Sequence, residues 1–265
     1  MYLPSLTWSQ AAQFLSTGPV VIQPLGSHEQ HGAIGPLGTD FIIPEHFATD
    51  LEQLYPQQVA LLPPLPYGVC PYHQAFAGTI DIGIPTLTSI LESVVKSLIP
   101  TGARHFLFLN GHGGNDPAID AACLCAWKMG GIGAKINWWT VARELNPAWG
   151  GGHGGAQEAS VVESLHPTWV NHDLIKEEEI YSLSDSFPSV YGNAINYRGA
   201  TINIIRPTEE FTKTGTFGGL NDQSCHTNPQ KGREIYQGVL DWMKAFIPDF
   251  KNIDPSVRRG KPTAL

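Results

Sequence analysis

The sequence predicts an α/β protein with a mostly parallel central sheet that is covered by helices on both faces. Short apolar runs of strand length alternate along the chain with longer amphipathic runs of helix length. Polar, glycine-rich loops follow several of the apolar runs. Strands separated by helices of this length indicate βαβ units, in which neighbouring strands run parallel. No internal repeat or shift in composition marks a boundary, so residues 1–265 are expected to form a single domain.

Four apolar segments are predicted to be strands. Residues 20–25 form a run that ends at a Gly-Ser pair, and residues 59–62 form a second run that two prolines stop. Residues 105–109 give the clearest signal and lead directly into a glycine-rich loop, and residues 134–141 are the fourth predicted strand. Ligands of such sheets bind at the loops beyond the carboxyl ends of the strands, so these loops are the expected location of a site.

Four helices are predicted, over residues 85–98, 116–129, 157–165 and 230–246. The first has apolar residues at helical spacing, with Pro85 suited to its first turn and Gly102 to its end. The segment 177–197 has weak periodicity and is expected to be a long loop or an insertion.

The composition excludes several classes of protein. The 24 acidic residues outnumber the 16 basic ones, which argues against a general binder of nucleic acids or anionic membranes. No apolar run is long enough for a transmembrane helix, and the first residues do not resemble a secretory signal, so a cytoplasmic location is expected. The four cysteines match no zinc ribbon or redox motif and are expected to be plain thiols. Charged residues make up only 15% of the chain, which favours burial in an oligomer interface.

The loop after the first predicted strand carries an unusual set of polar residues: Glu29, His31 and, nine residues later, Asp40. Buried carboxylates without cationic partners are costly, and no Lys or Arg lies between residues 1 and 50. A divalent metal would neutralise them, and oxygen ligands with a histidine nitrogen suit zinc or manganese better than calcium. The alternative is a solvated acidic loop in which Asp40 caps a helix.

Two further loops carry histidines among glycines. His112 lies in the loop 110–115, and the stretch 149–158 contains His153 and ends with Glu158. The glycines allow the backbone to approach a ligand closely. Each loop also has a simpler interpretation, in which the histidines only hydrogen-bond or face solvent and Glu158 complements a helix dipole.

Taken together, the three loops favour a metal-dependent hydrolase. Two histidines and three carboxylates can hold two divalent ions if one carboxylate bridges them. Two ions about 3.5–4 Å apart can activate a shared water and polarise a carbonyl, while a further histidine transfers protons.

The motifs GSHEQHG with a following GTD, NGHGGN and HGGAQEAS resemble those of the creatininase family of metal-dependent amidohydrolases, over roughly residues 5–245. The resemblance implies a three-layer α/β/α sandwich with a mostly parallel central sheet. It also implies two divalent metal ions per subunit (zinc, manganese or both) and a homohexamer.

The resemblance also assigns roles to individual residues. Glu29, His31, Asp40 and His112 match the family's metal ligands, with Asp40 as the bridging carboxylate. The remaining residues with an assigned role are Glu158 as the last metal ligand and a catalytic residue, His153 as the acid–base residue and Trp149 as the cover of the substrate. In creatininase a Glu two residues after the second-loop His serves a metal, and here that position is Gly114.

Positions that are expected to face the substrate depart from the family pattern. Where the family often shows GxSxEHxxFPGT, this chain has Cys70 in place of Ser, Tyr72 in place of Glu, and then His73. The metal ligands are therefore kept while the substrate positions change, so the sequence predicts the hydrolase class more firmly than creatinine as substrate.

The leading expectation for the reaction is hydrolysis of a C–N bond in a small polar cyclic amide, with His153 passing a proton to the leaving nitrogen. The alternatives on the same two metal ions are ring opening of a keto-inositol and deformylation of a formamide. A non-catalytic oligomeric binding protein is a further alternative. The three loops contain no Lys, which favours an uncharged small-molecule substrate, although Arg198, Arg206 or Lys213 could reach the site from later loops.

Overall fold

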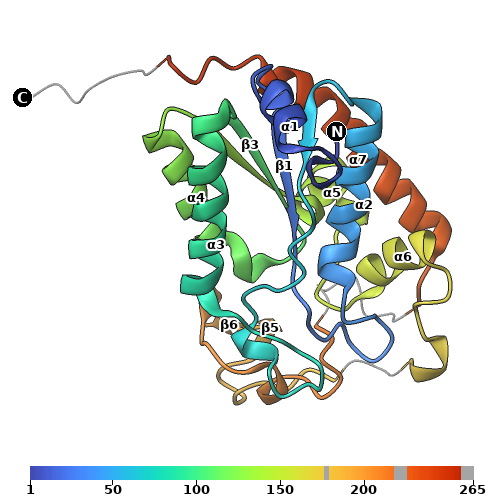
Figure 1. Cartoon of the computed structure of the whole chain (residues 1–265). Coiled ribbons are helices and arrows are strands. Elements are labelled where there is room, and N and C mark those ends of the chain that lie inside the picture. The colour runs from blue at the N-terminus through green and yellow to red at the C-terminus, as the bar shows by residue number, and fades with distance from the viewer. Residues whose placement is uncertain (176–178, 218–225, 258–265) are drawn as a thin grey trace, which may run out of the picture.

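The computed structural model describes residues 1–175, 179–217 and 226–257. Its centre is a parallel four-stranded sheet with the order β2-β1-β3-β4 (Figure 1). The strands are β1 (Val20–Leu25), β2 (Val59–Leu61), β3 (His105–Asn110) and β4 (Ile132–Asn137). Val20 pairs with Val59 on one side and with His105 on the other, and His105 pairs with Ile132. The first three predicted strands are confirmed.

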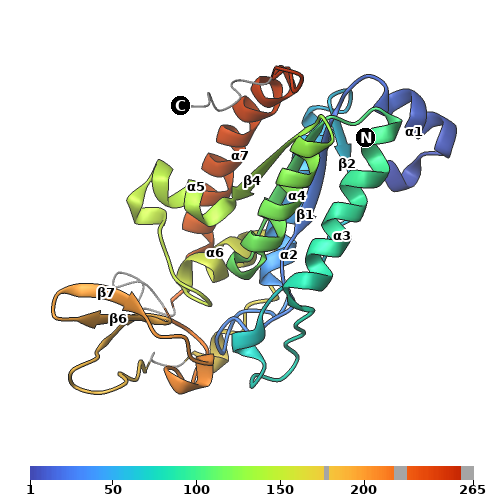
Figure 2. The ribbon, with the colours of Figure 1, turned by 90° about the vertical axis from the view of Figure 1, so that its left-hand side faces the viewer.

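Helices cover both faces of this sheet, as Figure 2 shows. The helices are α1 (Trp8–Leu15), α2 (Thr39–Leu54), α3 (Gly83–Leu98), α4 (Asp116–Lys128), α5 (Trp138–Leu145), α6 (Ala156–Leu165) and α7 (Pro229–Lys251). Short 3-10 turns are Leu3–Ser5, Pro71–His73, Ile99–Thr101, Gly113–Asn115, Pro147–Trp149, His172–Leu174 and Thr208–Glu210. Within the described ranges, no helix is long and apolar enough to cross a membrane.

Alternate residues of the strands pack into two separate cores, one on each face of the sheet, which makes the protein a three-layer α/β/α sandwich. Phe106 and Phe108 of β3 lie in the core that contains Leu87 of α3 and Ile119 of α4. Leu107, between them, lies in the other core with residues of α2, α6 and α7. Both faces of the sheet are therefore apolar, and burial on both faces explains why its strands read as continuous hydrophobic runs. The predicted layers and parallel sheet are confirmed.

The predicted strand 134–141 is wrong in its second half. β4 ends at Asn137, and Trp138 begins α5. Trp138 and Ala142, one helical turn apart, are both buried, so the segment buries one helical face. The tryptophans, threonine and valine at 138–141 have high strand propensity, but packing against the core overrides it.

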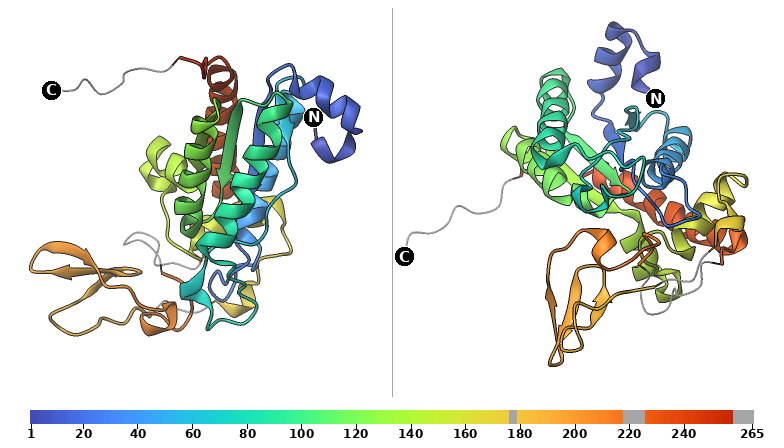
Figure 3. Two further views of the ribbon diagram at one scale, coloured as in Figure 1. Left: turned by 60° about the vertical axis from the view of Figure 1, so that its left-hand side comes forward. Right: turned by 90° about the horizontal axis from the view of Figure 1, so that it is seen from below.

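A small antiparallel sheet lies beyond the carboxyl ends of the main strands, at the bottom of Figure 3. It consists of β5 (Ser189–Tyr191), β6 (Ala194–Tyr197) and β7 (Ala200–Asn203). The segment 177–197, expected to be a long loop or an insertion, supplies β5 and β6. Its first two residues, 177 and 178, lie outside the described residues, as does Cys225. The three cysteines within them, Cys70, Cys123 and Cys125, are free thiols.

Candidate metal centre

The candidate ligands come together because β1 and β3 are neighbours and end at the same edge of the sheet. Leu25 pairs with Asn110 at the last position of both strands. The loop after β1 then supplies Glu29 and His31, and the loop after β3 supplies His112. Asn115 ties these loops together: its side chain donates to Gly26 O at 2.9 Å and accepts from Val69 N at 3.0 Å.

Asp40 reaches the same point from the first turn of α2, and two glycines make this approach possible. A Cβ atom on Gly26 would lie 2.2 Å from the backbone oxygen of Asp40, and one on Gly111 would lie 1.7 Å from it. That oxygen receives no helical hydrogen bond from residue 44, because Pro44 has no N–H. Both loops therefore pack directly against the first turn of α2.

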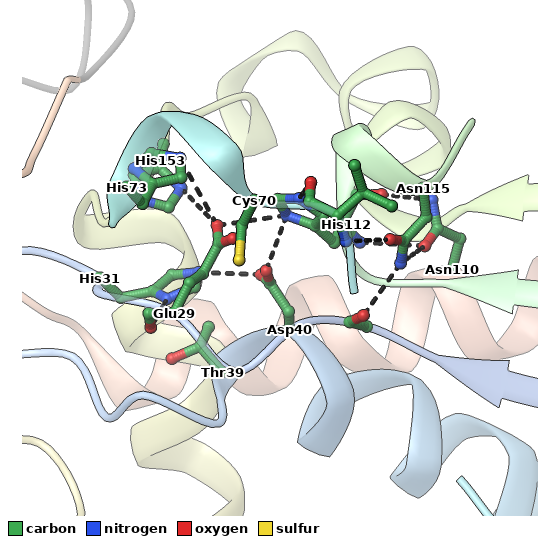
Figure 4. A network of polar contacts seen from close by, with 12 residues as sticks. Glu29, His31, Thr39, Asp40, Cys70, His73, Asn110, His112, Asn115 and His153 are labelled. Carbon is green, nitrogen blue, oxygen red and sulfur yellow. Dashed lines mark hydrogen bonds and ion pairs between the residues drawn. The ribbon is translucent and has the colours of Figure 1, made fainter. Parts of the chain in front are cut away.

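The carboxylate of Asp40 lies between two imidazoles (Figure 4). Its Oδ1 is 2.8 Å from Nε2 of His31, and its Oδ2 is 3.0 Å from Nδ1 of His112. Glu29 Oε1 is 3.2 Å from the same His112 Nδ1. Asp40 thus occupies the place of a bridging ligand, and the bridging role itself stays a prediction.

The two carboxylates are buried in a way that calls for a cation. Glu29 is 0% exposed, and neither of its carboxylate oxygens has a hydrogen-bond partner; Asp40 Oδ2 lacks one as well. Within the described chain, the ion-pair partners of Glu29 and Asp40 are all histidines, with no Lys or Arg among them. Two buried carboxylates opposed only by histidines are costly unless the histidines are protonated or a cation is bound, so this donor set fits a divalent metal ion.

The two histidines are held in the tautomer that a metal requires. His112 donates from Nε2 to the carbonyl of Val69 at 2.8 Å, and His31 donates from Nδ1 to the carbonyl of Glu29 at 3.1 Å. The other ring nitrogen of each therefore faces the carboxylates. Metal-bound histidines commonly have such a second hydrogen bond, which fixes the orientation of the ring.

Without a metal, the charges of the site hold protons on these rings. Burial opposes the charged form of His31, but Asp40, with Glu158 and Glu29, outweighs it and raises its pKa to about 10. Burial opposes the charge on His112 too, yet Glu29 and Asp40 raise its pKa well above the ordinary value. Burial also opposes ionisation of Asp40, whose pKa His31 and His112 nevertheless hold well below its usual range. The buried carboxylates therefore stabilise positive charge at this site, which in the metal-free protein is carried by the protonated histidines.

Glu158 supplies a third carboxylate from the first turn of α6. Its Oε2 is 3.8 Å from Nε2 of His31 and accepts from Gly154 N at 2.8 Å. Burial, together with Asp40, raises the pKa of Glu158 to about 7 against the opposing effect of His31.

No ligand side chain fits at Gly114, because a Cβ atom there would lie 2.0 Å from Val69 O and 2.5 Å from His112 Nε2.

The imidazoles of His73 and His153 also lie close to the carboxylate of Glu29. Nε2 of His73 and Nδ1 of His153 are each 3.7 Å from Glu29 Oε1, and the two rings stack with centroids 4.5 Å apart. Burial lowers the pKa of His73, against the opposing effect of Glu29. Burial, with the charges of His31 and His73, lowers the pKa of His153 well below its ordinary value. These lowered pKa values favour the neutral form of both rings.

Gln30 orients this pair and was not predicted as a site residue. Its Oε1 accepts from Gly32 N at 2.9 Å and its Nε2 donates to Gly215 O at 3.0 Å, which fixes the amide. Nε2 also lies 3.0 Å from His73 Nδ1 and 2.8 Å from His153 Nε2. Its place between Glu29 and His31 in the sequence is the only signal that could have pointed to it.

Several sets of these residues have ligand atoms within 4.8 Å of one another. The sets are Glu29 with His31 and Asp40, His31 with His153 and Glu158, and Glu29 with His73 and His153. His112 belongs to none of these sets, but its Nδ1 lies 3.2 Å from Glu29 Oε1 and 3.0 Å from Asp40 Oδ2, so the five predicted metal ligands face one centre.

A cleft of about 380 Å³ opens over the centre. Of the predicted substrate residues, Cys70, Tyr72 and His73 line it. Burial raises the pKa of the Cys70 thiol to about 12, so it is no thiolate nucleophile. Trp149 does not line the cleft: its ring packs against Gly238 of α7, and Trp139 lines the cleft instead. A substrate contact by Trp149 stays a prediction.

Fold and site together define a class: an α/β protein with a buried carboxylate–imidazole centre suited to divalent metal ions. The chain belongs to the creatininase family, because residues 4–247 match the family model Creatininase, described as creatinine amidohydrolase.

Individual relatives have different activities. A mycofactocin precursor peptide peptidase of Mycolicibacterium smegmatis is 38% identical over 249 residues, which cover 91% of each chain. A 3-dehydro-scyllo-inosose hydrolase of Thermotoga maritima is 32% identical over 282 residues, covering 97% of this chain and 85% of that protein. Two solved creatininase structures, a mutant of the Zn-Zn type and the Mn form, match with TM-scores of 0.73 and 0.72. Both are 19% identical and cover 95% of this chain, and the matches span 98% and 99% of those chains.

Proposed function

We propose that this chain is a metal-dependent hydrolase that cleaves the C–N bond of an amide, and that the amide belongs to a short, uncharged peptide segment. The observation that carries the hydrolase proposal is the fully buried Glu29, whose carboxylate has no hydrogen-bond partner and is surrounded by imidazoles. The mycofactocin precursor peptide peptidase at 38% identity supports a peptide as substrate.

Two ions are the expected cofactor. Glu29, Asp40 and His112 would hold one, and His31, Asp40 and Glu158 the other. Zinc and manganese both suit these oxygen and nitrogen donors. When bound, the pair supplies a water molecule of lowered pKa and polarises the scissile carbonyl.

His153 is the proposed proton carrier. Its Nε2 lies 2.8 Å from the carbonyl oxygen of Gln30 and 2.8 Å from the side-chain Nε2 of Gln30. Because that amide gives its two protons to Gly215 O and His73 Nδ1, we place the proton of His153 on Nε2, directed to the carbonyl. Nδ1 is then free of a proton and faces the centre. It takes a proton there as the attack begins and returns it to the leaving nitrogen.

His73 has the opposite arrangement. Its Nδ1 accepts from Gln30 Nε2 at 3.0 Å and from Thr208 Oγ1 at 2.9 Å, so its own proton is on Nε2. That N–H faces Glu29 at the floor of the cleft and is placed to donate to a polar group of the substrate. The stacked pair thus presents one acceptor and one donor.

The side chains that line the cleft favour an uncharged substrate. Among the described residues that line it, none is Lys or Arg, and four are aromatic: Tyr72, Trp139, Tyr191 and Phe217. A phosphate or carboxylate group would find no cationic side chain there, whereas a neutral amide finds aromatic faces and one N–H donor.

Two other substrates are supported by relatives. The family description as creatinine amidohydrolase supports a small cyclic amide, and the Thermotoga maritima relative supports a keto-inositol. A panel of blocked tripeptides, creatinine, hydantoin and 3-dehydro-scyllo-inosose separates the three when purified protein is assayed with zinc or manganese. We expect two equivalents of metal and peptide hydrolysis that a chelator abolishes and added metal restores. Less than one equivalent of metal with no turnover on any substrate would instead indicate a non-catalytic binding protein.

The chain is also proposed to be a homohexamer in the cytoplasm. Large apolar side chains are exposed on α1 and α4, including Trp8, which is 85% exposed, and Leu124 and Trp127. Such side chains are commonly covered in an oligomer. Light scattering on the purified protein tests the assembly: a mass of one chain would overturn it.

A further inference from the structure

A second cavity of about 270 Å³ adjoins the metal cleft. The two share one wall, formed by Tyr72, His73, Tyr191 and Phe217. The rest of the second cavity is lined by the small sheet and the 3-10 turn that follows it: Gly192, Asn193, Ala194, Asn203, Thr208 and Phe211.

We propose that this second cavity is a specificity subsite that takes an uncharged, apolar or aromatic side chain of a peptide next to the scissile bond. The inference rests on the proposed amide hydrolysis and adds to it a defined preference for one residue of the substrate. A small ring held beside Glu29 leaves the second cavity open, whereas a peptide has a side chain to place in it.

The chemistry of the lining selects this occupant. Phe217 meets Phe211 and Tyr191 edge-on, with ring centroids 5.2 and 5.4 Å away. Asn193 and Asn203 add amide groups. Among the described lining residues there is no Lys, Arg, Asp or Glu. A charged side chain would lose its hydration without gaining a partner, while an apolar one gains contact with the rings.

The walls of the cavity are held in place by Arg206, which lies behind them. Its backbone N–H donates to Asn193 Oδ1 at 2.7 Å, and its Nη2 donates to Ser189 Oγ at 3.0 Å. Its guanidinium lies over the ring of Phe211, 5.3 Å from the centroid. One buried residue, through its backbone and its side chain, therefore links β5, the β5–β6 turn and Phe211, which supports a pre-formed cavity.

The shared wall connects the subsite to the chemistry. Thr208 lines the second cavity and donates to Nδ1 of His73 at 2.9 Å, while Nε2 of His73 faces Glu29. Only the imidazole of His73 thus separates a side chain in the second cavity from the metal centre. This separation matches a residue directly beside the bond that is cleaved, rather than one several positions away.

The test uses acetyl-Ala-X-Ala amides, in which X is Gly, Leu, Phe, Asp or Lys and lies next to both inner peptide bonds. The metal-loaded full chain is compared with Ala194→Phe, which fills the second cavity. Ala200→Phe is the matched control, because Ala200 is an exposed residue of the same sheet that does not line the cavity. Asn203→Phe, on the other strand of the lining, is a second filling variant in case Ala194→Phe does not fold.

We expect kcat/KM of the wild type to be at least about tenfold higher for Leu and Phe than for Gly, and lower for Asp and Lys than for Gly. Ala194→Phe should lose that tenfold preference, so that its kcat/KM no longer distinguishes Leu and Phe from Gly, whereas Ala200→Phe should keep the wild-type preference. Equal kcat/KM for Gly, Leu and Phe in the wild type would overturn the subsite and leave amide hydrolysis standing. Hydrolysis of creatinine or the inosose but of no peptide would overturn the peptide substrate itself, and the subsite with it.

Discussion

Gly111 lies against the carbonyl oxygen of Asp40 so closely that a Cβ atom on Gly111 would be 1.7 Å from that oxygen. Gly111→Ala should therefore push the β3 loop away from α2, cost about 2 kcal/mol or more in the free energy of unfolding, and lower the bound metal. Urea denaturation and metal analysis measure both effects. Gly113→Ala is the control, because its Cβ would meet only Trp139, at 3.9 Å. Equal stability of the two variants would contradict the close packing.

Asp40 is expected to hold both ions. Its two carboxylate oxygens face different histidines, His31 and His112. Asp40→Ala should therefore reduce the metal content from two ions per subunit to nearly none, as measured on the dialysed protein. Asp120→Ala, an exposed aspartate of α4, should retain both ions. Two ions retained in Asp40→Ala would remove the bridging role.

Metal affinity should rise with pH across the neutral range. The pKa of His31, raised to about 10 in the metal-free protein, means that an ion must displace a proton at any pH below that value. Raising the pH removes this competition and so tightens binding. Competition with a chromogenic chelator at pH 6, 7 and 8 measures the effect, and an affinity that stays constant over this range would show that no proton is displaced.

His153→Ala should keep both metal ions and lose turnover by about 10²-fold or more, as expected for a residue that transfers a proton. The metal-facing pairs of Asp40 with His31 and His112 do not involve it. Turnover under saturating substrate, together with metal content, separates loss of proton transfer from loss of the ions. His172→Ala, an exposed histidine, is the control. Unchanged turnover in His153→Ala would exclude His153 from the mechanism.

Two tryptophans should respond differently to truncation. Trp139 lines the cleft, so Trp139→Ala should raise KM for the substrate several-fold. Trp149 packs on Gly238, so Trp149→Ala should lower the free energy of unfolding by about 3 kcal/mol. Steady-state kinetics and urea denaturation check the pair. A larger KM effect in Trp149→Ala than in Trp139→Ala would restore the role that the sequence predicts for Trp149.

Sequence reasoning succeeded for the fold where burial is uniform. The strands at 20–25, 59–61 and 105–110 are fully buried, so their apolar runs are unambiguous. It failed at 138–141, where β-branched and aromatic residues form a helix, and it assigned no element to α2, which contains Pro44. In both cases tertiary packing decides the structure against the local preference.

The sequence predicted those site residues that lie within one of the short polar motifs. Glu29, His31, Asp40, His112 and Glu158 all face one centre, as their loops suggested. Gln30, Thr208 and Trp139 were missed. Gln30 depends on the carbonyl of Gly215, 185 residues away, and Thr208 on His73, 135 residues away. No spacing in the sequence reveals such partners.

The crowding around Gly114 restricts how this chain can evolve. A glutamate at position 114 first requires the carbonyl of Val69 to move away by about an ångström, because a Cβ atom there would lie 2.0 Å from it. That carbonyl also fixes the ring of His112, so moving it loosens an existing ligand before the new one can form. A Gly114→Glu substitution would therefore disturb the existing ligand His112 instead of simply adding a new one.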